Sequence, residues 1–141
     1  MGLDMFLYTY PKGLEENIKK IESLSNEERN KVWDEVFEVA YWRKCNFLHK
    51  YLCDNGEEIT SEIIYLIPRK VLYDFLEKTV KVVKRKNTRF SSKTLPTCSG
   101  FFYGSTEYDE NYYDQGYDAI LKITEILKNS DDEKFLYYAS W

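Results

Sequence analysis

Histidine, cysteine and proline are scarce in this sequence, and long apolar runs are missing from it. The 141 residues include one histidine, three cysteines and three prolines. A single histidine excludes chemistry that needs a histidine pair, and cysteines without a CxxC spacing favour reduced thiols over a disulfide framework. Because no apolar run approaches the roughly 20 residues that cross a bilayer, we expect no membrane span.

The N-terminal segment MGLDMFLYTY also lacks the basic stretch that begins a secretion signal. Reduced thiols are typical of proteins that stay in the cytosol. We therefore predict a soluble, cytoplasmic protein.

Positive charge is in deficit, with 20 Lys and Arg residues against 24 Asp and Glu and a formal net charge of −4. Such a balance argues against a general nucleic-acid binder. The basic run from Lys78 to Arg89 is a local exception, and cations at a helix C-terminus are already favoured by the helix dipole. We expect a solvated helix end here, with a nucleic-acid contact as the less favoured alternative.

Aromatic residues, in contrast, are abundant: the chain has 13 Tyr, 8 Phe and 3 Trp. That is more than a minimal core requires. Because a tyrosine ring carries a polar tip, the surplus predicts surfaces or pockets that combine apolar contact with hydrogen bonding.

Hydrophobic periodicity predicts a mixture of strands and helices. Strands are expected where short runs are apolar or β-branched, over Leu3–Tyr10, Ile59–Ile67, Phe101–Tyr103 and Phe135–Trp141. Helices are expected where apolar residues recur at helical spacing, over Leu14–Leu24, Asn26–Cys53, Arg69–Lys84 and Glu107–Lys128. The segment Asn87–Thr94 is predicted to be a polar loop.

The longest of these helices, Asn26–Cys53, follows Ser25 and Glu28, which have the spacing of a capping box. It is partly apolar all round, which is typical of a central helix. We therefore predict one domain over residues 1–141 with an α+β fold. A small, mostly antiparallel sheet of three or four strands would pack on three to four helices, with this long helix at the centre.

The stretch Leu95–Tyr113 combines a proline turn, a glycine-bounded aromatic segment and a helix start. Backbone N–H groups at a helix start lack partners and attract anions. Gly104, Ser105 and Thr106 would allow close approach of a phosphate. The remaining groups that we expect to supply charge, hydrogen bonds or stacking to this ligand are Trp42, Arg43, Lys44, Asn46, His49, Lys50, Tyr103 and Tyr108.

A plainer interpretation of the same residues stays open. Ser105 and Thr106 can simply cap their helix. Arg43 and Lys44 can extend to solvent or pair with acidic side chains, for which the candidates are Asp4, Asp109 and Glu110.

Other chemistries have weaker support in the sequence. Cys45, His49 and Cys53 follow one another at intervals of four residues, but three ligands on one helix do not converge on a tetrahedral zinc ion. Acidic residues near the start of the Glu107–Lys128 helix are explained by capping and by the helix dipole. We therefore expect no metal and no cofactor, and a binding protein rather than an enzyme.

Four segments resemble a family of small bacteriophage and prophage proteins to which no biochemical activity is assigned. They are GLDM at 2–5, VAYWRKCNFLHKYLCDN at 39–55, LPTCSGFFYGSTEYDENYY at 95–113 and the final ASW. Cys45 and Cys53 stand where the relatives are expected to have small apolar residues, which argues against a cysteine-based function. The resemblance implies an accessory role in the cytosol of a bacterial host.

These lines combine into one hypothesis with two alternatives. The protein would bind a small anionic, nucleotide-derived ligand between the central helix and the Gly104–Thr106 turn without turning it over, and so sequester a host immune signalling nucleotide. The first alternative is an inhibitor that contacts a host enzyme through a Tyr-rich surface, and the second is a small nucleotide hydrolase. The aromatic strands at both termini make a homodimer an open possibility.

Overall fold

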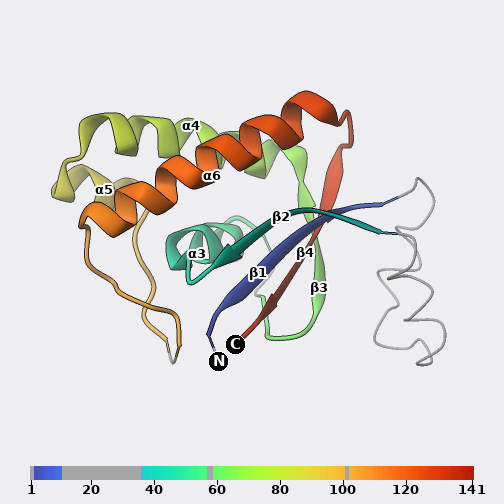
Figure 1. Ribbon diagram of the computed structural model, residues 1–141, viewed down its shortest axis with the longest axis horizontal. Coiled ribbons are helices and arrows are strands. Elements are labelled where there is room, and N and C mark those ends of the chain that lie inside the picture. Colours follow the sequence, from blue (N-terminus) through green and yellow to red (C-terminus); the bar gives the residue numbers. More distant parts are fainter. Residues whose placement is uncertain (1, 11–35, 57–58, 101) are drawn as a thin grey trace.

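The computed structural model describes residues 2–10, 36–56, 59–100 and 102–141 and has two layers, a sheet and a set of helices (Figure 1). The strands are β1 (Asp4–Thr9), β2 (Phe37–Arg43), β3 (Ile64–Pro68) and β4 (Lys134–Ser140). The helices are α3 (Asn46–Asp54), α4 (Arg69–Arg85), α5 (Thr88–Thr94) and α6 (Glu110–Asn129). The predicted α+β class is confirmed.

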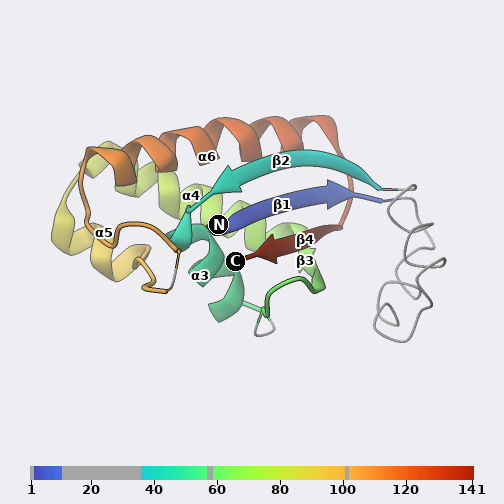
Figure 2. The ribbon, with the colours of Figure 1, turned by 60° about the horizontal axis from the view of Figure 1, so that its bottom comes forward.

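The four strands form one antiparallel sheet in the order β2-β1-β4-β3, and Figure 2 shows them side by side in this order. The two outermost segments of the chain therefore supply the two central strands. Phe6 of β1 lies opposite Tyr41 of β2 on one side and opposite Tyr138 of β4 on the other. Alternation along β1 places Met5 and Leu7, both fully buried, on the opposite face of the sheet.

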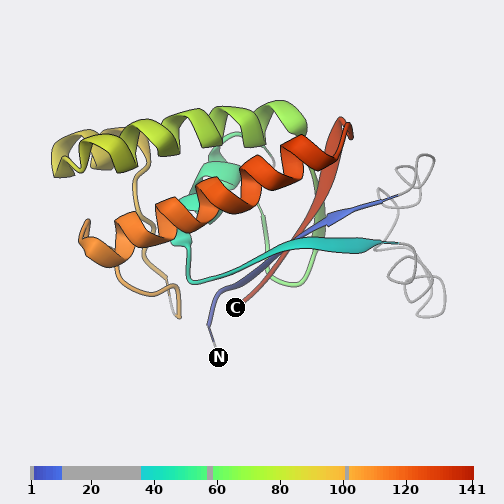
Figure 3. The same ribbon diagram turned by 45° about the horizontal axis from the view of Figure 1, so that its top comes forward.

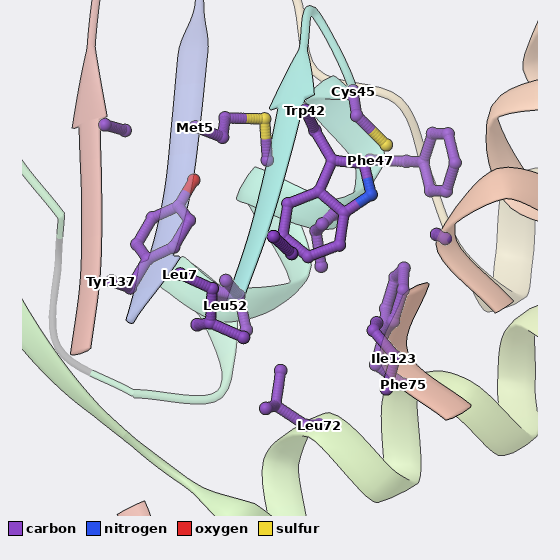
Figure 4. Close-up of a cluster of buried hydrophobic side chains, with 14 of the residues drawn as sticks. Met5, Leu7, Trp42, Cys45, Phe47, Leu52, Leu72, Phe75, Ile123 and Tyr137 are labelled. Atoms are coloured by element: carbon purple, nitrogen blue, oxygen red, sulfur yellow. The ribbon is translucent and has the colours of Figure 1, made fainter. Parts of the chain in front are cut away.

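The main core lies between that inner face and helices α3, α4 and α6. In Figure 4, Met5 and Trp42 from the sheet point toward Phe47 of α3, Phe75 of α4 and Ile123 of α6. All five side chains are at least 95% buried. At about 25 cal/mol per Å² of apolar area removed from water, clusters of this kind supply most of the stability of a small fold.

Helices α4 and α6 lie side by side over the sheet (Figure 3), and one glycine permits their close approach. A Cβ atom at Gly116 would lie 2.9 Å from Cγ2 of Val83. The carboxyl end of α6 is then fixed by the first residue of α4. The Arg69 guanidinium donates to the backbone oxygens of Leu127 (2.7 Å), Ser130 (2.6 Å) and Asp132 (3.3 Å).

The prediction of one long helix over Asn26–Cys53 is wrong for the described part of that range, residues 36–53. Residues 37–43 form strand β2, and only Asn46–Asp54 is helical. The alternation of β2 fits a sheet, because Ala40 and Trp42 are buried whereas Tyr41 is exposed. Pairing with β1 outweighs the helical spacing of the same apolar residues, since sheet formation depends on tertiary context. The longest helix described is α6.

Smaller differences lie at the ends of other elements. The predicted strand Ile59–Ile67 begins only at Ile64, and Phe102–Tyr103 is not a strand. The predicted polar loop Asn87–Thr94 contains helix α5, whose first turn is capped by the Asn87 side chain, which accepts from the Phe90 N–H. The predicted helix Leu14–Leu24, the Ser25–Glu28 capping box and Phe101 lie outside the described residues.

Other expectations agree with the structure. The predicted strands at the two termini correspond to β1 and β4, and the predicted helix Arg69–Lys84 corresponds to α4. Within the described parts of the chain, no helix combines the length and the apolar character that crossing a membrane requires.

Candidate functional site

Three stretches that are far apart in the sequence meet beside the start of α3: the beginning of β1, the end of β2 and the loop over residues 95–106. The Leu3 N–H donates to the Phe102 carbonyl oxygen over 3.0 Å. The Lys44 N–H donates to the Leu3 carbonyl oxygen over 2.7 Å. The predicted basic residues and the predicted glycine turn are thus gathered at one end of the sheet.

Asn46, the first residue of α3, holds the 95–106 loop from inside. Its side chain is buried and donates to the carbonyl oxygens of Tyr103 (3.1 Å) and Ser105 (3.0 Å). Its amide oxygen accepts from the Cys98 N–H over 3.2 Å. Both N–H donors of the amide are therefore used within the protein. Asn46 positions the loop and has no donor left for a ligand.

Lys44 lies against the Gly104 turn, as the ligand hypothesis requires of it. A Cβ atom at Gly104 would lie 3.1 Å from the Lys44 Cβ, and one at Gly2 would lie 3.0 Å from the Lys44 Cε. Gly104 has φ +88° and Lys44 itself has φ +56°, both in the left-handed region. The two glycines leave room for the lysine stem, and Gly104 accommodates a backbone conformation that side chains disfavour.

Arg43 is turned toward β1 instead. Its Nη1 lies 3.1 Å from Oδ1 of Asp4, and the Tyr41 hydroxyl donates to the same carboxylate oxygen. Pairing with Asp4 is one of the plainer alternatives that the sequence left open. The Arg43 side chain is about half exposed, so this ion pair is screened by solvent and contributes little stability.

The helix start beside Gly104 is already occupied by acidic groups. Helix α6 begins at Glu110, and the Asp109 carboxylate accepts from the Tyr112 N–H over 3.1 Å. Ser105 instead accepts from the Glu107 N–H, and the Thr106 carbonyl accepts from Thr97. Because carboxylates repel a second anion, this helix start disfavours a phosphate.

Trp42 and Tyr108, which were expected to stack on a base, are both engaged. Trp42 is buried in the core with the Lys122 ammonium 5.6 Å from its ring centre. The Tyr108 hydroxyl accepts from the Thr97 N–H, and its ring packs on Tyr112 with centroids 5.0 Å apart.

Tyr103 and Cys98, which both bond to Asn46, also line a surface cleft of about 750 Å³. We call it the α3 cleft. Three of the predicted residues line it: His49, Lys50 and Tyr103. The other predicted residues do not, and the lining residues that sequence reasoning missed are Cys53, Asp54, Ile59, Thr60, Ser61, Cys98 and Trp141. The aromatic character of the final ASW segment was the one signal that pointed to Trp141.

Aromatic rings form the inner end of the α3 cleft. The centroid of the His49 ring lies 5.6 Å from that of Tyr103 and 5.1 Å from that of Trp141, both in edge-to-face contact. Tyr103 and Trp141 also meet edge to face at 5.5 Å. Trp141 is 37% exposed, whereas Tyr103 and His49 are buried.

His49 is held in its neutral form. Its Nδ1 lies 2.7 Å from the hydroxyl of the fully buried Tyr137, and its Nε2 lies 3.7 Å from Sγ of Cys53. Burial lowers the pKa of His49 from 6.5 to about 4. Near pH 7 the imidazole is therefore uncharged, and its place in this network is structural.

The Cys53 thiol of the cleft is held in its protonated form, and Lys50 is held in an ion pair. Burial raises the pKa of the Cys53 thiol, which keeps it protonated and weakens it as a nucleophile. Lys50 pairs with Asp54 over 3.0 Å at the rim. In the part of the chain that the structure describes, no group of three or more His, Cys, Asp or Glu side chains is placed to hold a metal ion.

The neutral state of His49 predicts a specific pH dependence of stability. A histidine whose pKa is about 4 when folded and 6.5 when unfolded stabilises the fold above pH 6.5, and this contribution is lost as the pH falls toward 4. We expect the free energy of unfolding to fall by about 2 kcal/mol between pH 7 and pH 5 from this residue. Urea titrations of wild type and His49→Phe test it. The difference between the two proteins should change with pH, and a constant difference would contradict the account.

Comparisons of the chain with known protein families, with curated proteins and with solved structures found no match.

Proposed function

We propose that the protein binds a small, anionic, nucleotide-derived ligand in the α3 cleft and holds it without turnover. The observation that carries this proposal is the combination of a partly exposed tryptophan, Trp141, which packs on the buried rings of Tyr103 and His49, with the Lys50 ammonium group in the same cleft. The volume of about 750 Å³ lies within the range of small-molecule sites. We place the ligand in this cleft rather than at the Gly104–Thr106 turn, because the acidic residue that lines the cleft, Asp54, is balanced by Lys50, whereas Asp109 and Glu110 stand together at the helix start that follows the turn.

The aromatic end suits a nucleobase. Trp141 is partly exposed, and the buried Tyr103 packs against it edge to face. Burial raises the pKa of Tyr103 to about 12, so its hydroxyl is protonated near pH 7 and can donate a hydrogen bond. Stacking on an aromatic side chain is worth about 1–3 kcal/mol per base.

The rim suits a phosphate group. The ion pair between Lys50 and Asp54 is partly exposed and joins neighbouring turns of one helix. Such pairs contribute about 0.3–0.5 kcal/mol, so a phosphate can displace Asp54 from the ammonium at low cost. Thr60 and Ser61 line the same cleft, but their hydroxyl groups already bond to the Tyr65 hydroxyl and to the Trp141 backbone, so Lys50 is the group that we assign to the phosphate.

The protonation states in the cleft favour binding over chemistry. A thiol with a raised pKa and a neutral histidine tied to Tyr137 lack the thiolate–imidazolium pairing that activates a cysteine nucleophile. This is why we rank the small nucleotide hydrolase below the binding protein.

The resemblance to bacteriophage and prophage proteins extends the proposal to a cellular role. A phage protein that holds a nucleotide without consuming it would lower the free concentration of that nucleotide in the host cytosol. Sequestration of a host immune signalling nucleotide is the role that we propose on this basis. This role requires that the α3 cleft binds a nucleotide.

The test is a thermal-shift screen of the purified protein with cyclic nucleotides and ADP-ribose derivatives. Ligand at about 100 times its Kd should raise the Tm by about 9 °C. Trp141→Ala and Lys50→Ala should abolish the shift, whereas Lys128→Ala, an exposed lysine on α6, should retain it. Heat denaturation should release the ligand intact, and recovery of a cleaved product would favour the hydrolase. A wild-type protein that responds to no ligand of the panel overturns the proposal.

A second candidate, inhibition of a host enzyme by surface contact, is favoured by the outer face of the sheet. The ring of Phe6 lies 5.0 Å from Tyr41 and 6.2 Å from Tyr138, measured between centroids, on the face opposite the main core. Aromatic residues are enriched at protein interfaces. If a purified host enzyme is inhibited in a 1:1 complex and Tyr41→Ala relieves the inhibition, this second function is supported.

A further inference from the structure

A dense group of positive charges lies where α4 is followed by α5. We call it the basic corner and define it as Lys81, Lys84, Arg85, Lys86, Arg89 and Lys93. All six side chains are exposed. Residues 77–93 carry a net charge of +6, whereas the whole chain carries −4. Figures 1 and 3 place this corner at one end of the helical layer.

The fold concentrates these charges more than the sequence predicted. Lys86 has φ +49° and turns the chain at the end of α4, and Asn87 caps α5 immediately afterwards. Ser91 of α5 then contacts the Tyr113 hydroxyl of α6 over 3.0 Å. Arg89 and Lys93 are one turn apart on α5, so their side chains share one face of this helix, beside the end of α4.

Capping of α4 accounts for only part of the basic corner. The helix dipole favours Lys84 and Arg85, which lie in the last turn of α4. Arg89 lies beyond that helix and gains nothing from its dipole. Among the residues that the structure describes, the salt bridges involve Arg43, Lys50 and Lys122, and no cation of the basic corner is paired with an acid.

We propose that the basic corner binds the phosphate backbone of duplex nucleic acid without reading its sequence. A protein interface or a membrane-inserted helix is favoured by a cluster of exposed apolar residues beside the cations. Val80, next to Lys81, is 44% exposed, but from 84 to 93 the exposed positions are all charged or polar. Binding to the regular row of phosphates on a duplex requires only positive charge, and the cations of the basic corner, which form no ion pair with an acid among the described residues, provide that charge.

A single strand fits less well than a duplex. Proteins that bind single strands present aromatic rings on which the bases stack. The aromatic ring of this corner, Phe90, is half-buried and lies under the Arg85 guanidinium, 4.3 Å from its centroid. The acidic start of α6, with Asp109 and Glu110, limits the contact to the side formed by α4 and α5.

The test is fluorescence anisotropy of a labelled 20-base-pair DNA duplex with the full chain. With about four phosphates contacted, raising the salt concentration from 50 to 200 mM should weaken binding about 100-fold. The double variant Arg85→Glu/Arg89→Glu should bind at least about tenfold more weakly at 50 mM salt. The control Lys70→Glu/Lys128→Glu changes the net charge by the same amount at two exposed positions outside the corner and should retain binding.

Three results would overturn the proposal. In the first, the two double variants lose DNA affinity equally, which would show that binding depends on the net charge of the protein and not on the basic corner. Another is tighter binding of the single strand than of the duplex. The third is binding to phosphatidylserine vesicles but not to the duplex. An RNA duplex of the same length should bind within tenfold of the DNA, as expected of a contact that reads phosphates.

Discussion

Asn46→Ala is expected to lower the free energy of unfolding by about 4 kcal/mol, the largest effect of any single substitution considered for this protein. The substitution removes three hydrogen bonds at once. It leaves the carbonyl oxygens of Tyr103 and Ser105 and the N–H of Cys98 without their partner. The bond to the Tyr103 carbonyl is buried and the other two are part-buried, and a polar group shielded from water that loses its partner costs more than the bond itself contributed. Urea denaturation monitored by circular dichroism measures the loss.

Asn55→Ala is the matched control, because Asn55 lies at the other end of α3 and makes one exposed hydrogen bond, to the Tyr51 carbonyl. Its loss should cost under about 1 kcal/mol. Asn46→Asp should be as damaging as Asn46→Ala, since a carboxylate cannot donate to two carbonyl oxygens. Equal stabilities for Asn46→Ala and Asn55→Ala would show that the 95–106 loop is held by other contacts.

Arg69→Ala is expected to lower the free energy of unfolding by about 3 kcal/mol. The guanidinium satisfies backbone oxygens at the carboxyl end of α6 and in the turn that leads to β4. A cation at this end of a helix is also favoured by the helix dipole. Losing it should loosen both the last turn of α6 and its connection to the sheet. Chemical denaturation gives the magnitude, and amide hydrogen exchange locates the loss.

Arg69→Lys separates charge from geometry. A lysine keeps the positive charge but cannot donate to three oxygens in the fixed arrangement of a guanidinium, so it should recover only part of the lost stability. Lys70→Ala, at the neighbouring exposed position, should change stability by less than about 0.5 kcal/mol. Full stability of Arg69→Ala would contradict the role given to this contact.

The parts of the fold that could be predicted from the sequence are those where the local pattern and the tertiary structure agree. The terminal strand β4 combines aromatic and apolar residues that become buried on both faces, as with the fully buried Leu136 and Tyr137. Helix α4 has a consistent apolar face that includes Leu72 and Phe75, and Pro68 precedes its first turn. Such segments need no knowledge of their partners.

Strand β2 could not be predicted in the same way. Apolar residues at Phe37, Ala40 and Phe47 match a helical spacing, yet Ala40 and Trp42 also match the alternation of a strand. The choice is made by β1, which pairs with β2 over residues 4–9. That pairing is a long-range contact, and no window of the local sequence contains it.

Long-range contacts also explain why most residues of the α3 cleft could not be predicted from the sequence. The approach of Lys44 to Gly104 agrees with the placement expected from the sequence. The α3 cleft, however, is assembled from α3, the 59–61 segment, the 95–106 loop and the end of β4. Ser61 and Trp141 contact each other through the Ser61 hydroxyl although they are far apart in the sequence. Residue types alone do not predict such a long-range contact.

The most direct test of ligand binding in the α3 cleft is a ¹H–¹⁵N NMR titration with the nucleotide that gives the largest thermal shift. The chain has three tryptophans and therefore three indole N–H signals. We predict that the Trp141 signal moves, together with the backbone amides of Lys50, Ser61 and Tyr103, while the buried Trp42 signal stays in place. A nucleotide that moves the amides of Gly104 and Ser105 but leaves Trp141 unchanged would contradict the assignment.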